Sequence, residues 1–215
     1  MSAPQCVHVL LLSKEASGER FWQCRVISPE LGGVVCLLRR SSGSKKTISR
    51  IEPDLFDTAR VQVRKPSGSE VLYFVEDYEP LVRRSGLGSS YRSLQAAAFW
   101  ANLLGGNLAA VPADAGDALF GHVSRAFDLL QAGHPPLLIL FKGVYLLLKL
   151  EGYPVRESWW QDLSAARRSA VARYLQANIE GLPDDLEADL APLFEQLCHW
   201  ARVHTDLQIP DKVLT

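Results

Sequence analysis

The stretch Val34-Val-Cys-Leu-Leu-Arg-Arg-Ser-Ser-Gly-Ser-Lys-Lys-Thr-Ile-Ser-Arg-Ile51 joins an apolar run to a basic segment rich in Ser. Val and Leu favour a β-strand that ends at Arg39, and the Ser and Gly residues favour a loop. No acidic residue interrupts the cations of this stretch, which are Arg39, Arg40, Lys45, Lys46 and Arg50. Such a loop on a β-scaffold suits a run of phosphates. The alternative is an edge loop whose charges only prevent aggregation.

Short runs rich in β-branched and aromatic residues predict further strands on both sides of this stretch. The expected strands cover residues 6–13, 21–28, 34–39, 55–64 and 70–75. The fourth alternates most clearly, with Leu55, Ala59, Val61 and Val63 on an apolar face and Arg60, Gln62 and Arg64 on a wet one. Five short strands favour a small barrel, and the OB-fold is the simplest five-stranded barrel.

After Pro80 the sequence changes to Leu, Ala and Phe at helical spacing. The expected helices cover residues 91–104, 114–132, 137–151, 164–180 and 190–204, the fourth with Ser164 as its N-cap. The third is apolar on nearly all sides and is expected at the centre of the helical packing. The predicted fold class is α+β with two domains, an OB-fold barrel at residues 1–79 and an all-helical domain at residues 80–215.

Length and charge agree with two domains. The chain has 215 residues and a formal net charge of −1, but residues 1–65 hold 11 Lys and Arg against 6 Asp and Glu, whereas the remainder holds 12 against 18. A basic front half and an acidic back half indicate different partners. The N-terminus lacks the pattern of a secretory signal, and the longest apolar run, 137–150, is too short to span a membrane. A cytoplasmic protein is therefore expected.

The sequence contains no P-loop, nucleophile elbow or His-Glu-x-x-His motif. The four cysteines, Cys6, Cys24, Cys36 and Cys198, show no Cys-x-x-Cys spacing, so free thiols are expected and neither a disulfide framework nor a zinc site is indicated. His199 and His204 would lie about 140° apart around a helix, which disfavours a shared metal. No catalytic residue, metal or cofactor is expected.

Three further groups of residues could take part in binding or catalysis. Glu76, Asp77 and Glu79, expected in a linker, are a weak candidate for a hydrolytic metal site. Two basic groups could extend a phosphate track, although exposed Arg usually only solvates a surface; they are Arg83 with Arg84, and Arg167 with Arg168 and Arg173. Phe21, Trp22 and Tyr73 could stack bases if they face outward, but the barrel core is the commoner place for such side chains.

Four segments follow one another in an order known from one family. They are Ser28-Pro-Glu-Leu-Gly-Gly-Val-Val-Cys-Leu-Leu-Arg-Arg40, Val71-Leu-Tyr-Phe-Val-Glu-Asp-Tyr-Glu-Pro-Leu-Val82, Tyr91-Arg-Ser-Leu-Gln-Ala-Ala-Ala-Phe-Trp-Ala-Asn-Leu-Leu104 and Leu140-Phe-Lys-Gly-Val-Tyr-Leu-Leu-Leu-Lys-Leu-Glu-Gly-Tyr153. They resemble a turn and basic strand end, the last barrel strand, the first domain helix and the central helix of the bacterial recombination mediator family RecO. The resemblance spans nearly the whole chain. The four-cysteine zinc module of many relatives is missing between Tyr153 and Leu182.

The resemblance implies a non-enzymatic protein of DNA repair, with an N-terminal OB-fold and a C-terminal helical domain. Such a protein would bind single- and double-stranded DNA and anneal complementary strands. With the partner RecR it would help to load the recombinase RecA onto DNA coated by single-strand-binding protein. A bacterial, nucleoid-associated location follows from the same resemblance.

The resemblance also implies site residues. DNA would lie on Arg39, Arg40, Lys45, Lys46 and Arg50, and strand alternation adds the outward-facing cations Arg25, Arg60 and Arg64. The acidic, apolar tail of single-strand-binding protein would bind an apolar groove of the helical domain beside Arg125, Lys142 or Lys149. The first alternative is a protein-interaction adaptor whose OB-fold no longer binds nucleic acid. The second is a hydrolase that uses the three carboxylates Glu76, Asp77 and Glu79.

Overall fold

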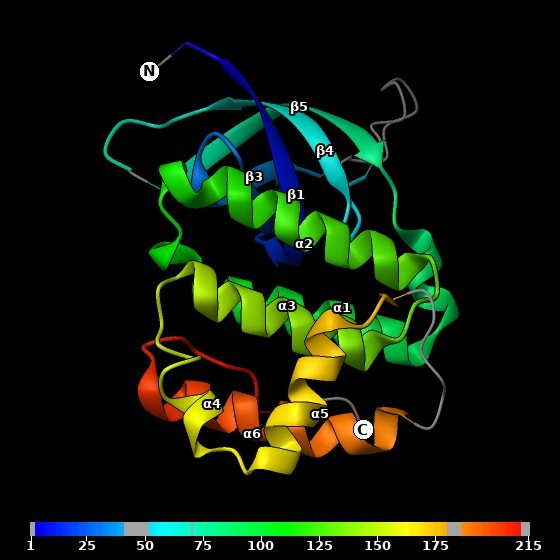
Figure 1. The fold of residues 1–215 in the computed structure, drawn as a ribbon. Coiled ribbons are helices and arrows are strands. Elements are labelled where there is room, and N and C mark those ends of the chain that lie inside the picture. The colour runs from blue at the N-terminus through cyan, green and yellow to red at the C-terminus, as the bar shows by residue number, and fades with distance from the viewer. Residues whose placement is uncertain (1–2, 41–51, 70, 180–185, 212–215) are drawn as a thin grey trace. The chain divides into compact units, whose positions relative to one another are not determined.

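The structure, a computed structural model, describes residues 3–40, 52–69, 71–179 and 186–211. The chain has an α+β architecture with a closed five-stranded barrel followed by helices, as predicted (Figure 1). It divides into two compact units, one of residues 1–85 and 104–124 and the other of residues 86–103 and 125–215. The boundary expected near Pro80 lies inside the last barrel strand.

The barrel is formed by β1 (Gln5–Ser17), β2 (Phe21–Ser28), β3 (Gly32–Arg39), β4 (Thr58–Arg64) and β5 (Leu72–Val82). Their order around the barrel is β1-β2-β3-β5-β4, and β1 pairs with β4 to close it. The pairing of β3 with β5 is parallel, whereas the other neighbours are antiparallel. This is the OB-fold topology that the sequence predicted.

Alternate side chains of the strands fill the barrel interior. Its core includes Val7, Val9, Leu11, Cys24, Val26, Val34, Cys36, Ala59, Val61, Val63 and Tyr73. The predicted inward face of β4 is confirmed except at Leu55, which precedes the strand and is 42% exposed. Burial raises the pKa of Cys24 to about 11 and that of Cys36 to about 12, which keeps both thiols protonated.

Two strands are longer than the sequence indicated. The polar residues after Ser13 predicted a turn. Strand β1 nevertheless continues to Ser17, because it pairs with β2 up to the pair Ser17 and Phe21. Strand β5 was expected to end at Val75, but it continues to Val82 along β4. The acidic residues between these two positions therefore lie on a strand and not in a linker.

The turn between β2 and β3 is the place where residues 104–124 dock on the barrel. The Gly33 backbone N–H donates to the Val111 carbonyl oxygen over 2.9 Å. A Cβ at Gly33 would lie 2.1 Å from the Leu108 carbonyl oxygen, and one at Gly116 would lie 2.4 Å from that of Ser28. Only glycine allows the two backbones to approach this closely. The docked segment contains η2 (Leu108–Ala110), η3 (Ala113–Ala115) and the start of α2 (Gly116–Gln131).

Glu30 ties the same turn to β1. Its carboxylate accepts hydrogen bonds from the Ser28 hydroxyl over 2.8 Å and from the His8 backbone N–H over 3.1 Å, and it pairs with His8 Nδ1 at 3.0 Å. Burial acts to raise the pKa of Glu30, but these hydrogen bonds outweigh burial and hold the pKa below its ordinary value of 4.5. The turn is therefore best held when Glu30 is ionised.

Stability should fall in acid through Glu30, because a lowered folded-state pKa stabilises above the unfolded pKa and is lost as pH falls. Glu30→Gln should unfold about 1 kcal/mol more easily than wild type at neutral pH, and the difference should shrink below about pH 4. Urea unfolding at several pH values measures it. Glu15→Gln, which changes an exposed carboxylate of β1, is the control. If the difference in unfolding free energy between Glu30→Gln and wild type did not change with pH, this role of Glu30 would be contradicted.

The helical unit is organised around α3 (Pro136–Leu150), as the sequence predicted. Leu140, Phe141, Val144 and Leu148 of α3 are fully buried. Gly143 lies against Trp100 of α1 (Tyr91–Gly106), so that a Cβ there would lie 2.4 Å from the indole Cζ2. The remaining helices are α4 (Trp159–Asp162), α5 (Ala165–Gln176) and α6 (Leu186–His204).

Local signals explain the ends of these helices. Ser164 is the N-cap of α5, as predicted, and its side chain accepts from the Arg167 backbone N–H over 3.3 Å. Gly133 follows α2 with a φ of +84°. Short α4 was not expected; its Trp159 is buried and contacts Phe141, with ring centroids 6.4 Å apart. Within the described ranges, no helix has the length and apolar character that crossing a bilayer requires.

Candidate nucleic-acid interface

The outer surface of β2 and β3 carries three of the candidate residues, Phe21, Arg25 and Arg39, and continues onto β5. Since Trp22, Leu38 and Tyr73 lie on the core side, their sequence neighbours point outward. The outward set is Phe21, Gln23 and Arg25 on β2, Val35, Leu37 and Arg39 on β3, and Leu72 and Phe74 on β5. The face formed by strands 2 and 3 is the one with which OB-folds bind oligonucleotides.

Two aromatic rings lie next to each other on this face. The centroids of Phe21 and Phe74 are 6.2 Å apart and their planes are inclined by 59°. Phe74 is 37% exposed, and Phe21 lies directly across from Arg39 in the β2–β3 register. Phe74 was not predicted as a site residue. Its position directly after Tyr73, which faces the core, would have indicated that it points outward.

Trp22 holds two cations where β2 begins and β3 ends. Lys14 Nζ lies 4.5 Å and the Arg40 guanidinium 4.3 Å from an indole ring centroid, both within cation–π range. Lys14 Nζ also donates to the Pro53 carbonyl oxygen over 2.9 Å. Trp22 packs partly on the barrel core, so these cations are positioned by a rigid element.

The predicted DNA-binding cations differ in their exposure and in the groups that they contact. Arg39 is exposed, Arg40 is half-buried, and no Asp or Glu among the described residues lies within ion-pair distance of either. Lys45, Lys46 and Arg50 fall in 41–51, outside the described residues. The Arg25 side chain runs beside the C-terminal end of α1, where a Cβ at Gly105 would lie 3.9 Å from Arg25 Cδ. The partial negative charge of that helix end attracts the Arg25 cation.

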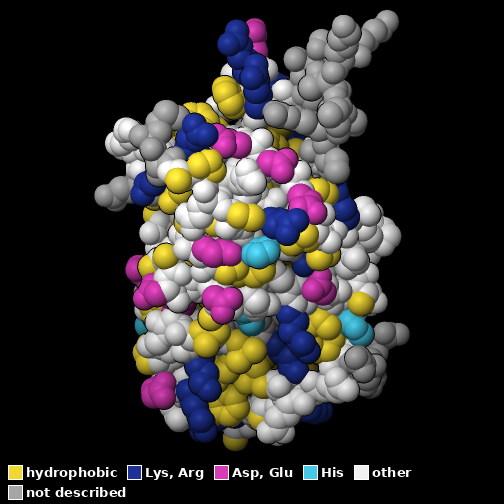
Figure 2. Space-filling view, turned by 90° about the horizontal axis from the view of Figure 1, so that it is seen from above, with side chains coloured by type: hydrophobic (Ala, Val, Ile, Leu, Met, Phe, Trp, Pro, Cys, Tyr) yellow, Lys and Arg dark blue, Asp and Glu magenta, His cyan; other side chains and the backbone are white. Residues whose placement is uncertain are grey.

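Arg60 and Arg64 face outward as predicted, but both are already paired with carboxylates. Arg60 Nη2 lies 2.5 Å from Glu79 Oε2, and Arg64 Nη2 lies 2.6 Å from Glu76 Oε1. The hydrogen bond and the charge of Glu79 raise the pKa of Arg60 above its ordinary value. A phosphate would have to displace a carboxylate at either position. Figure 2 likewise shows dark blue Lys and Arg side chains close to magenta Asp and Glu side chains over much of the face it presents.

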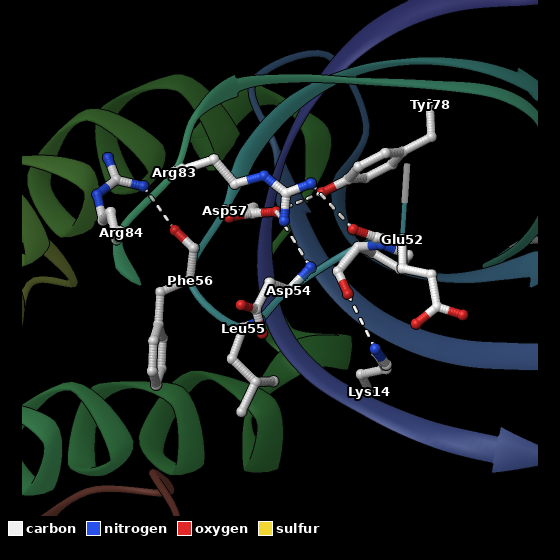
Figure 3. A network of polar contacts seen from close by, with 10 residues as sticks. Lys14, Glu52, Asp54, Leu55, Phe56, Asp57, Tyr78, Arg83 and Arg84 are labelled. Carbon is white, nitrogen blue, oxygen red and sulfur yellow. Dashed lines mark hydrogen bonds and ion pairs between the residues drawn. The ribbon is translucent and has the colours of Figure 1, made fainter. Parts of the chain in front are cut away.

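Buried polar contacts hold the segment 52–58, which leads into β4 (Figure 3). Asp57 is 1% exposed, and its Oδ2 accepts from the Tyr78 hydroxyl over 2.9 Å and from the Asp54 backbone N–H over 3.0 Å. Arg83 Nη1 lies 3.1 Å from the same oxygen. Burial raises the pKa of Asp57, and the hydrogen bonds and the charge of Arg83 oppose that rise. This arrangement fixes the chain just after residues 41–51.

Arg84 also holds the segment 52–58, which we call the anchor together with the side chains that bind it. It is 3% exposed, and its Nη1 donates to the Phe56 carbonyl oxygen over 2.6 Å and to Thr58 Oγ1 over 2.9 Å. Phe56 has a φ of +67°, a left-handed conformation that non-glycine residues seldom adopt. The pair Arg83 and Arg84, which the sequence left open as a phosphate track, is thus engaged within the protein.

The three cations expected at a partner site lie in different settings of the helical unit. Lys142 Nζ donates to the Ala177 carbonyl oxygen over 2.5 Å, and burial lowers its pKa. Arg125 and Lys149 are exposed. Lys149 is flanked on α3 by Leu146 and Leu150, which are 44% and 63% exposed.

Catalysis or metal binding would require His, Cys, Asp or Glu side chains that lie close together. Within 3–40, 52–69, 71–179 and 186–211, no three His, Cys, Asp or Glu side chains are grouped so that they could hold a metal ion. Cys198 is buried, which raises its pKa to about 12, and His204 stacks on Trp200 with ring centroids 5.2 Å apart. Neither is placed as a nucleophile or base. The carboxylates of Glu76 and Glu79 are engaged by arginines.

Neither a protein-family model nor a curated protein matches the chain. The assignment of a function therefore rests on the barrel topology, the side chains of its outer face and the resemblance of the four sequence segments.

Proposed function

We propose that the chain is a non-enzymatic DNA-binding recombination mediator of the RecO type. It binds single- and double-stranded DNA through the barrel, anneals complementary strands and helps to load RecA on DNA coated by single-strand-binding protein, with a RecR-like partner. The observation that carries this proposal is the placement of Arg39 and Arg40 on an OB-fold, with no described carboxylate paired to them. Cations without acidic partners attract phosphates without reading bases.

Annealing needs no catalytic residue under this proposal. Two strands must be held together with their repulsion screened and with most of their bases free to pair. Arg39, Arg40 and Lys14 supply the screening near one end of the barrel, and Lys45, Lys46 and Arg50 continue the basic sequence from there.

The helical unit would bind the tail of single-strand-binding protein. Of the three cations considered, Lys149 suits an acidic, apolar peptide best, because exposed Leu146 lies one turn before it on α3 and exposed Leu150 lies one turn after Leu146. Lys142 is engaged with the end of α5. This choice would fail if Lys149→Ala left the affinity for the tail peptide unchanged.

The salt dependence of DNA binding tests the proposal. If about four phosphates are neutralised, affinity for a labelled oligo-dT strand should fall about fiftyfold between about 50 and 200 mM salt. Changing Arg39 and Arg40 to Ala should weaken binding and flatten this dependence, and adding Lys45→Ala and Lys46→Ala should extend both effects. The variant with Arg125 and Lys149 changed to Ala removes the same charge from the helical unit and should bind as wild type does.

A second candidate, the interaction adaptor without nucleic-acid binding, is favoured by one specific observation. Arg60 and Arg64 are paired with Glu79 and Glu76, so the barrel offers fewer free cations than its sequence indicated. If wild type binds no DNA at low salt but still captures a RecR-like protein or the tail peptide, the adaptor replaces the mediator.

A further inference from the structure

An aromatic and apolar strip crosses the outer face of three barrel strands. Phe21 of β2, Leu37 of β3 and Phe74 of β5 all point away from the core, and Leu37 lies directly across from Phe74 in the register. Exposed Arg39 lies across from Phe21. Phenylalanine rings on the solvent side of a closed barrel add nothing to its interior packing, so their placement indicates a binding role.

The two rings are arranged so that they do not cover each other. Their centroids are 6.2 Å apart with planes inclined by 59°, so the rings are not stacked face to face. Phe74 keeps 37% of its surface exposed. An apolar ring surface beside a guanidinium that no described carboxylate pairs with is complementary to a nucleotide, whose base is flat and whose phosphate is anionic.

We propose that Phe21 and Phe74 form a base-stacking platform, with Arg39 beside it for the phosphate, which makes the barrel prefer single-stranded over duplex DNA. This inference rests on the proposed function, since it requires that the barrel binds DNA. In a duplex the faces of the bases are covered by their neighbours, so only an unpaired base can lie on the platform. The cations attract the phosphates of both forms of DNA, whereas the rings can stack only on unpaired bases.

The platform is also compatible with annealing. Two rings engage only one or two bases, and the remaining bases of the strand stay free to find a complement. Once they pair, the stacked bases leave the rings, because the duplex offers no free base face. Platform and cations together would therefore hold a single strand and release the duplex product more readily.

The experiment compares two probes of equal charge, an oligo-dT strand of about 15 nucleotides and an abasic sugar-phosphate strand of the same length. Wild type should bind the dT strand about 5- to 150-fold more tightly than the abasic strand, which is the range for stacking one base on an aromatic ring. Phe74→Ala should lower dT affinity toward the abasic level, Phe21→Ala combined with Phe74→Ala should bring it close to that level, and Phe74→Tyr should keep it near the wild-type value.

Two controls separate stacking from damage to the fold. Phe74→Ala should leave affinity for the abasic strand unchanged, and Leu81→Ala, which truncates another exposed side chain of β5, should change neither affinity. Equal binding of both strands by wild type would overturn the platform and leave the DNA-binding function standing. Loss of abasic binding in Phe74→Ala would also overturn the platform, and no binding of either strand by wild type would overturn both proposals.

Discussion

Replacing Gly33 with alanine is expected to destabilise the protein by about 3 kcal/mol, the upper part of the range for overpacking. The new methyl group would lie 2.1 Å from the Leu108 carbonyl oxygen, a backbone atom that no rotamer change can move away. Relief would require residues 108–111 to leave β3, which would break the 2.9 Å hydrogen bond from the Gly33 N–H to the Val111 carbonyl oxygen. Thermal unfolding followed by circular dichroism measures the effect.

Gly121→Ala is the matched control for this substitution. It makes the same chemical change in helix α2, at a glycine whose added Cβ would meet no atom within 4 Å. Because alanine favours the helix, this variant should be up to about 1 kcal/mol more stable than wild type. Equal stability of Gly33→Ala and wild type would mean that residues 108–111 do not dock on the start of β3.

The barrel was predictable because its signal is local. Inward residues such as Val61 and Val63 alternate with Arg60 and Gln62, and a two-residue period identifies a half-buried strand without knowledge of its partners. The sequence also contains Gly33, within the segment from Ser28 to Arg40. It does not show why a glycine is needed there, because the atoms that a side chain would meet belong to Leu108, far along the chain.

The candidate site was only partly predictable because charge pairing depends on register. Arg60 and Arg64 were correctly expected to face outward, but whether they meet water or a carboxylate depends on the strand beside them. Strand β5 places Glu79 across from Arg60, and an acidic run resembles a linker when its partner strand is unknown. Phe74 was not predicted as a site residue for a similar reason. The sequence did not show that Tyr73 faces the core, which places Phe74 on the outer side of the strand.

Replacing Asp57 with alanine is the second substitution expected to have a large effect, about 3 kcal/mol of destabilisation. The Tyr78 hydroxyl, the Asp54 N–H and Arg83 would lose their common acceptor. Arg83 is 40% exposed and can be rehydrated, which places the loss at the lower end of the range for a broken buried pair. Asp57→Asn, which keeps one acceptor oxygen but not the charge, should lose about half as much.

Hydrogen exchange can show that the loss begins in the anchor and not in the whole barrel. The Leu11 N–H donates to the Asp57 carbonyl oxygen and the Phe56 N–H donates to that of Leu11, each over 2.9 Å. Both amides should exchange faster in Asp57→Ala than in Asp77→Asn, a change at an exposed carboxylate of β5 that should cost less than about 0.5 kcal/mol. Unchanged stability in Asp57→Ala would mean that the buried carboxylate contributes nothing net. The left-handed turn at Phe56 would then be held by other contacts, among them Arg84 and the backbone hydrogen bonds.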